Sequence, residues 1–218
     1  MSKQKNVLIA DLPEILPVFP LGGVLLLPRG QLPLNIFEPR YLNMLDYALG
    51  HGRYIGMIQP DAETNSLSNV GCLGRITSFS ETEDGRMIVS LTGVCRFHVA
   101  DEMSVMTPYR QVQANYAPFK DDLVADVGSF DVDRDKLINV LERYLSMTGM
   151  SIDWESITNA SNETLVNSLS MISPFGPREK QAMLEATSLS ERNEILIALT
   201  EMALAQGDGT GDNDNPIQ

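Results

Sequence analysis

The residues best suited to hydrolytic chemistry in this chain are one serine and one lysine, Ser173 and Lys180. Such a pair can cleave a peptide bond if the lysine is unprotonated and lies within hydrogen-bond reach of the serine. Burial would have to lower the pKa of the lysine, whereas we expect Lys180 to lie on the exposed polar face of a helix. We therefore predict no peptidase centre here, and a hydrolase with an unrecognised site is the alternative.

Metal binding is the next chemistry to consider, and the candidate ligands are few. The chain has 2 histidines and 2 cysteines, which is too few for a histidine-based catalytic metal site. Cys95 and His98 have a chelating spacing, but on a strand their side chains point to opposite faces. Cys72 and Cys95 are better explained as small buried strand residues that stay reduced as thiols. The sequence leaves open whether these two thiols touch.

Nucleotide-binding motifs are absent from the sequence. A phosphate-binding loop of the GxxxxGK[ST] type needs a lysine directly after a glycine, and this chain contains no such pair. The glycines of Gly22-Gly23 and of Gly71-x-x-Gly74 are followed by no predicted helix that could present its positive end to a phosphate. We expect these glycines to form turns and bulges, and we expect no ATP hydrolysis and no cofactor.

The charge balance narrows the classes of partner. Acidic residues number 29 and basic residues 16, which gives a net charge of −13. A polyanion would be repelled by this field, and the arginines are scattered, so we expect no nucleic-acid partner and keep an RNA-binding module as the less favoured alternative. No apolar run approaches the roughly 20 residues that cross a bilayer, and no apolar leader precedes Asp11. We expect a cytoplasmic protein without a membrane partner.

The first stretch with a clear structural pattern is LPVFPLGGVLLLPRGQLPLNIFEPRYLNML, at residues 16–45. Its apolar runs, punctuated by prolines, predict two short strands. An amphipathic helix follows and begins at Glu38-Pro39, because proline is favoured at the first helical position. Gly50 and Gly52 are expected to end this helix.

Strand patterns follow at residues 54–60, 71–99 and 109–119. Asp84-Gly85 lies inside the second of these stretches and predicts a hairpin, since glycine and aspartate supply the positive φ angles of a tight turn. Gly71, Gly74 and Gly93 fall at strand positions where a missing side chain permits a bulge or a close approach of two backbones. These glycines suit a small, strongly bent barrel.

From Asp131 onward the apolar spacing becomes helical. Four helices are expected: one from the DVDRD segment to about Gly149, one over 162–172, one from Pro177, and one from a cap at Ser188 or Ser190 to Gly207. Glu191 can complete a capping box with Ser188. The remaining segment, GDGTGDNDNPIQ, carries almost no apolar side chain and is expected to be disordered.

Several of these motifs resemble the amino-terminal, substrate-binding domain of Lon proteases. The similar segments are LPVFPL, PLNIFE and EPRY, the series GRITSF, DGR and LTGVCRF, and the later string PFGPREKQAMLEATSLSERNEIL. The resemblance implies an α+β fold, with a small bent β-barrel of the PUA-like type over residues 12–118 and one inserted helix. A four-helix bundle over 119–206 would follow, between a flexible N-terminus at 1–11 and a disordered acidic tail at 207–218.

The resemblance also bears on function, because the Lon amino-terminal domain carries no catalytic residues. The chain is similar to that domain without the ATPase and protease domains that accompany it in Lon. This implies a non-catalytic module that binds proteins or unfolded peptides, as a substrate-recognition or adaptor component related to ATP-dependent proteolysis. The sequence indicates neither the partner nor the oligomeric state.

Six residues are candidates for contact with a partner: Glu38, Arg40, Tyr41, Met147, Met150 and Phe175. The first three have structural roles available, which we expect to come first. Glu38 would favour the exposed amides of its helix, Arg40 would pair with a carboxylate or with strand carbonyls, and Tyr41 would pack its ring. The methionines and Phe175 could form an apolar surface that repacks around different peptides, and packing in the core is the alternative.

Overall fold

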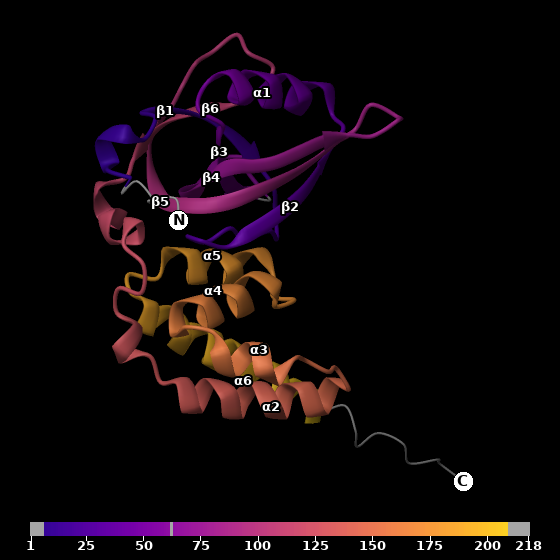
Figure 1. The fold of residues 1–218 in the computed structure, drawn as a ribbon, viewed down its shortest axis with the longest axis vertical. Helices are drawn as coiled ribbons and strands as arrows, with labels where there is room; N and C mark the ends of the chain where they lie inside the picture. Colours follow the sequence, from indigo (N-terminus) through magenta and orange to yellow (C-terminus); the bar gives the residue numbers. More distant parts are fainter. Residues whose placement is uncertain (1–6, 62, 209–218) are drawn as a thin grey trace.

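The computed structural model describes residues 7–61 and 63–208 of the chain. The predicted flexible N-terminus and disordered tail lie largely outside these residues. Within them, Ile9–Asp11 form a short 3-10 helix, η1, and the last helix continues to Asp208. Figure 1 shows the strands in one half of the molecule, with α1 over their outer end, and helices α2 to α6 in the other half.

One six-stranded sheet forms the first half. Its strands are β1 Ile15–Pro20, β2 Gln31–Ile36, β3 Tyr54–Pro60, β4 Leu67–Glu81, β5 Met87–Glu102 and β6 Gln111–Asn115. The strand order is β2-β5-β4-β3-β1-β6, and β5 also pairs with β6. Because of that extra pairing, the strands other than β2 form a closed ring of pairings. Among the described strands, β2 pairs only with β5 and so has a free edge.

The predicted hairpin connects β4 and β5. Glu81 pairs with Met87, and Gly85 adopts a left-handed φ of 79° in the turn between them. Asp84 accepts hydrogen bonds from the hydroxyl of Thr82 and from Arg86. Local turn chemistry thus sets the register of the two longest strands.

Two of the predicted glycines allow close approach inside the sheet. A Cβ at Gly71 would lie 2.5 Å from the ring of Phe97, and a Cβ at Gly93 would overlap the carbonyl oxygen of Leu27. The third, Gly74, follows a shift of register between β4 and β5. The prediction of bulges and close contacts at these positions is confirmed.

Helix α1, Pro39–Gly50, covers one end of the sheet. Its buried residues recur at intervals of three and four: Tyr41, Met44, Leu45 and Ala48. The ring of Tyr41 meets that of Phe19 edge-on at 4.3 Å between centroids, so the expectation that Tyr41 packs its ring is confirmed. Glu38 makes no side-chain capping hydrogen bond, because its carboxylate pairs with Arg40 instead.

Among the described residues, the second half contains five α-helices, whereas the sequence predicts four. They are α2 Arg134–Thr148, α3 Trp154–Asn159, α4 Asn162–Ile172, α5 Pro177–Glu185 and α6 Leu189–Asp208. The unexpected helix is α3, which is only 6 residues long and buries only Ile157, so it has no apolar repeat to reveal it. None of the described helices is long and apolar enough to span a membrane.

The capping contacts at the N-terminus of α6 agree only in part with the prediction. The hydroxyl of Ser188 accepts a hydrogen bond from the amide of Glu191, which confirms Ser188 as the cap. The carboxylate of Glu191 accepts from the amide and hydroxyl of Thr187, one residue before the position that a capping box requires. Ser190 donates to the carbonyl of Asp131 and is not the cap.

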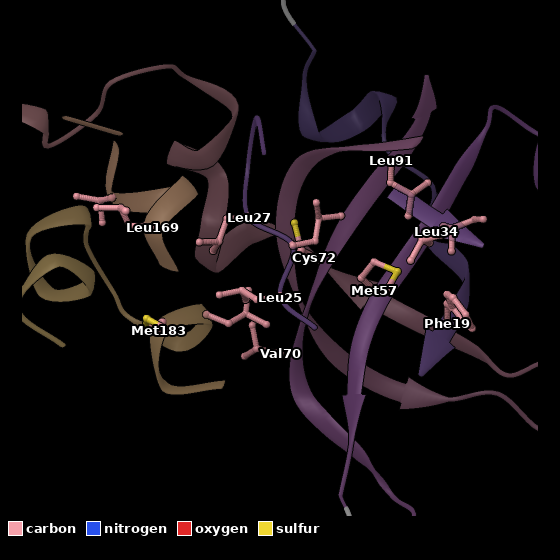
Figure 2. Packing of buried hydrophobic residues seen from close by; sticks show 14 of the residues in the cluster. Phe19, Leu25, Leu27, Leu34, Met57, Val70, Cys72, Leu91, Leu169 and Met183 are labelled. Carbon is pink, nitrogen blue, oxygen red and sulfur yellow. The ribbon is translucent and has the colours of Figure 1, made fainter. Parts of the chain in front are cut away.

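The two halves share one apolar core. Leu25, Leu26 and Leu27, between β1 and β2, are each at most 2% exposed and belong to the same buried cluster as Leu169 and Met183 of the helices. Figure 2 shows Leu25 and Leu27 between the strands and the helical segments that carry Leu169 and Met183. Burying apolar surface contributes about 25 cal/mol per Å². The shared core therefore stabilises the packing of the two halves against each other.

A buried ion pair joins the same two halves through the connecting segment. The guanidinium of Arg96 on β5 donates to both carboxylate oxygens of Asp122 at 2.9 Å. Asp122 belongs to η2, the 3-10 helix Ala117–Leu123 that follows the sheet. Arg96 also donates to the carbonyls of Leu184 and Ala186 at the end of α5. One side chain therefore connects strand, connecting segment and helix.

We expect Arg96→Met to lower the free energy of unfolding by about 3–5 kcal/mol, because removing one member of a buried ion pair leaves the other charge without a partner. Urea unfolding followed by circular dichroism measures the change. Arg86→Met is the matched control, since the side chains of Arg86 and Asp84 are 48% and 55% exposed. It should cost no more than about 1 kcal/mol, and equal losses in the two variants would contradict the prediction.

Both cysteines are free and fully buried, in different apolar clusters. Burial raises the pKa of the Cys72 thiol well above its usual range and raises the pKa of Cys95 to about 12. At pH 8 we expect neither thiol to react with Ellman's reagent in the folded protein, and both to react in urea, because only an accessible thiolate reacts.

The same pKa shifts predict a pH dependence of stability. The thiols of the unfolded chain lose protons above about pH 8.5, whereas the buried thiols keep theirs. The unfolded state therefore gains stability relative to the folded state as the pH rises from about 8.5 towards 12. Cys95→Ala should reduce the part of this decline that the thiols cause, measured by urea unfolding at pH 8 and pH 10, and an undiminished decline would contradict the assignment.

Candidate functional site

The free edge of β2 borders a groove of about 420 Å³, which we call the β2 groove. Its walls come from the end of β1, from β2 and from the start of α1. The lining residues are Phe19, Pro20, Leu21, Val24, Leu32, Pro33, Leu34, Asn35, Ile36, Phe37, Glu38, Arg40 and Tyr41. Apolar side chains predominate, and the lining includes no serine, cysteine, lysine or histidine that could act as a nucleophile or base.

The pairing of β2 determines which backbone groups face this groove. Pro33 lies opposite Ser90 on β5, and a proline has no N–H to donate to a neighbouring strand. The pair is therefore a non-hydrogen-bonded one, and the same holds two residues away for Gln31 and Asn35. At these three positions the backbone groups point away from β5, towards the free edge.

The side chains of β2 alternate between the interior and the groove rim. Leu34 and Ile36 are 7% and 1% exposed and point inward, whereas Gln31, Pro33 and Asn35 are exposed. Phe37, directly after the strand, is 61% exposed despite its large apolar ring. The groove thus combines unpaired backbone groups with an accessible aromatic side chain.

The first turn of α1 supplies the charged part of the rim. Arg40 and Glu38 form an ion pair at 2.7 Å, and the guanidinium of Arg40 also lies 4.6 Å from the centroid of the Tyr41 ring. Burial raises the pKa of Tyr41, although the charge of Arg40 opposes that shift. The three predicted residues therefore lie together, and Tyr41 forms part of the apolar wall.

A second concave site lies among the helices, which we call the bundle cavity. Its volume is about 410 Å³. It is lined by Leu137, Val140, Leu141, Tyr144, Leu145, Met150, Ser151, Ile152, Leu169, Ile172, Ser173, Pro174, Phe175, Leu196 and Thr200. These residues come from α2, α4, α6 and the loops that follow α2 and α4. None of the lining residues carries a charge.

Five of the six candidate residues are divided between the two sites, with Glu38, Arg40 and Tyr41 at the β2 groove, and the sixth belongs to neither. Met150 and Phe175 line the bundle cavity, while Met147 is 40% exposed and lies outside its lining. The β2 groove adjoins α1, and the bundle cavity adjoins α2 at the opposite end of the molecule (Figure 1). Sequence reasoning missed Phe37 and Ile172, because only the folded chain shows that these apolar side chains remain exposed.

Ser173 and Lys180 form no catalytic pair. Ser173 donates its hydroxyl hydrogen to the carbonyl of Leu169 at 2.6 Å, and the Lys180 amine donates to the carbonyl of Met171 at 3.1 Å. The expectation of an exposed Lys180 is wrong, since it is only 7% exposed, and burial lowers the pKa of its amine. Lys180 is buried because of tertiary packing. Helix α5 lies between the sheet and the other helices (Figure 1), and these elements cover part of its polar face.

Metal coordination has no support in the part of the chain that the structure describes, where no group of three or more metal-binding side chains occurs. Cys95 is buried, whereas His98 on the same strand is exposed. Their side chains lie on opposite faces, as expected.

Comparison with other proteins gives a consistent result. A sequence profile described as "ATP-dependent protease La (LON) substrate-binding domain" matches residues 15–201. The Lon protease of Syntrophus aciditrophicus is 24% identical over 196 residues, which cover 86% of this chain and 21% of that protein. The Lon protease of Escherichia coli K12 is also 24% identical over 196 residues, which cover 85% of this chain and 24% of that protein. The chain spans less than a quarter of the length of these relatives.

Two solved structures share the fold. The crystal structure of a Lon N-terminal domain protein from Xanthomonas campestris has a TM-score of 0.63 at 22% identity, and covers 84% of this chain and 97% of that one. The N-terminal domain of the Lon protease of the Mycobacterium avium complex has a TM-score of 0.65 at 16% identity, and covers 86% of this chain and 98% of that one. Since the family profile extends over residues 15–201, this chain belongs to the family of Lon substrate-binding domains.

Proposed function

We propose that the chain is a non-catalytic module that binds extended, apolar segments of unfolded proteins in the β2 groove. The observation that carries this proposal is the free edge of β2 beside an apolar groove. An extended peptide can add a strand to such an edge, with backbone hydrogen bonds giving affinity and side-chain pockets giving selectivity. We also propose that the closed ring of strand pairings forms a PUA-like barrel, beside which the edge of β2 is presented to the ligand.

The groove indicates what the bound segment should look like. Gln31 and Asn35 offer backbone donors and acceptors at the free edge, and Pro33 offers only its carbonyl. Alternate side chains of the added strand would meet the apolar wall near Leu32 and Phe37. The net charge of −13 favours segments that carry basic residues beside their apolar ones.

We further propose that binding serves ATP-dependent proteolysis, as substrate recognition or as an adaptor. The family description as a substrate-binding domain supports this role. Absence of catalysis is supported by the hydrogen bonds that occupy Ser173 and Lys180 separately, and a cytoplasmic location by two free cysteines. A hydrolase with another site is the second candidate, and RNA binding is the less favoured third.

Phe37→Ser should weaken the binding of a fluorescently labelled, reduced and carboxymethylated casein about tenfold. The reason is that burying a phenylalanine ring contributes about 1.5–3 kcal/mol, and 1.4 kcal/mol corresponds to a factor of ten. Fluorescence anisotropy measures the affinity. The control is Phe130→Ser, because Phe130 is 103% exposed and is not part of the groove lining. Equal losses in both variants would remove the groove from the proposal.

A second pair of variants tests strand addition itself. Gln31→Pro removes a backbone donor that faces the free edge, so we expect several-fold weaker casein binding and a nearly unchanged free energy of unfolding. Leu32→Pro removes a donor that faces β5 and should destabilise the protein by about 1 kcal/mol or more. If Gln31→Pro binds casein as tightly as the unmodified protein, the bound segment does not pair with β2.

The catalytic alternative is tested with the same substrate. Casein incubated with the protein, with and without ATP, should yield no new amino termini by mass spectrometry. Cleavage that persists in protein prepared from a protease-deficient host would instead establish a hydrolase. Retention on RNA that declines with salt would support the third candidate.

A further inference from the structure

The bundle cavity has the form of a ligand site that is independent of the β2 groove. Its volume of about 410 Å³ falls within the range of about 300–1,000 Å³ that is usual for small-molecule sites. Three helices and two loops contribute its walls, so the site is concave and is not a shallow groove along one helix pair. The inner wall is buried: Val140 and Leu196 are each 2% exposed.

The mouth of the cavity is apolar and open to solvent. Ile172 is 70% exposed and Met150 50% exposed, although both belong to the lining. Large exposed apolar side chains at a rim often mark a binding site, because covering them removes apolar surface from water and lowers the free energy. Met150 lies in a loop and has a flexible side chain that can adapt to an occupant.

Four residues of this apolar wall carry a hydroxyl group: Tyr144, Ser151, Ser173 and Thr200. Thr200 is 8% exposed and donates its hydrogen to the carbonyl of Leu196 at 2.7 Å. Ser173 donates in the same manner to Leu169. Because the hydroxyls of Thr200 and Ser173 have already used their hydrogens, each of these two oxygens retains a lone pair that can accept a hydrogen bond from an occupant.

The lining also defines what cannot bind well. It contains no lysine, arginine or histidine, and a carboxylate placed there would lose its hydration without gaining a counter-charge. The net charge of the chain, −13, disfavours anions further. The lining contains no aspartate or glutamate either, so a cation would also lose its hydration without gaining a counter-charge. The occupant must therefore be uncharged.

We propose that the bundle cavity binds a small uncharged molecule that is mostly hydrocarbon and carries one hydrogen-bond donor, for which Thr200 and Ser173 are the acceptors. This site is separate from the proposed peptide-binding groove, with which it shares no lining residue. A wall built from five segments suits a compact molecule better than a partner helix, which is about 10 Å across with its side chains.

The test uses the full chain and the uncharged fluorescent amine N-phenyl-1-naphthylamine as probe. We expect saturable binding of one probe per chain, with increased fluorescence, and displacement by 1-decanol. Ionised decanoate should displace the probe at least tenfold less well. Saturable binding with this order of displacement supports the proposal. Absence of saturable binding up to the solubility limit, or equal displacement by decanoate, overturns it.

Two variants separate the cavity from other apolar surface. Leu145→Trp fills space at the wall and should weaken probe binding at least tenfold. The matched control is Met202→Trp, because Met202 is 58% exposed on α6 and outside the lining, and binding should not change. Unchanged binding in Leu145→Trp overturns the proposal. Thermal unfolding by circular dichroism shows whether each variant is folded.

The polar contact has its own test, which also applies if Leu145→Trp fails to fold. The unmodified protein should bind 1-decanol about three to ten times more tightly than 1-methoxydecane, which lacks the donor. Thr200→Val keeps the shape of the side chain and should abolish this difference. Equal affinities for the two ligands in the unmodified protein overturn the assigned role of the hydroxyls. A peptide of amphipathic helical sequence that displaces the probe at lower concentration than 1-decanol would overturn the small-molecule assignment.

Discussion

The structure depends on the placement of Arg96. Its guanidinium is buried where β5, η2 and the end of α5 meet, and it satisfies Asp122 and two carbonyls at once. A buried charge is costly unless each of its partners is held in position, so this contact allows few alternative positions of the helices against the sheet. The face of Arg96 also packs against the ring of Phe119, 4.5 Å from its centroid. By holding the helices against the sheet, this junction fixes the distance between the β2 groove and the bundle cavity.

The local features of the fold could be predicted and the tertiary ones could not. The Asp84-Gly85 turn and the Pro39 helix start follow from the backbone preferences of a few adjacent residues. Arg96 and Asp122 are separated by 26 positions, and nothing in the pattern of either segment connects them. The sequence predicts an exposed Lys180, because amphipathic spacing cannot show that the sheet and the other helices cover the polar face of α5.

The candidate sites show the same division. The sequence motif singles out Glu38, Arg40 and Tyr41. The proposed binding depends instead on the unpaired edge of β2, which follows from the strand order and cannot be read from the motif. Exposed edges invite aggregation, and proline is one of the residues that limit it. Pro33 withholds a donor from unselective pairing, whereas Gln31 and Asn35 keep their backbone donors at the free edge.

The leucine segment Leu25–Leu27 has a consequence for cooperativity. Because it belongs to one buried cluster with helical residues as distant as Leu204, neither half can expose its interior without disrupting the other. The molecule then behaves as a single thermodynamic unit, and any occupant that prefers the folded state stabilises the whole of it. A molecule held among the helices would thus protect the strand edge from opening, with no movement of either site.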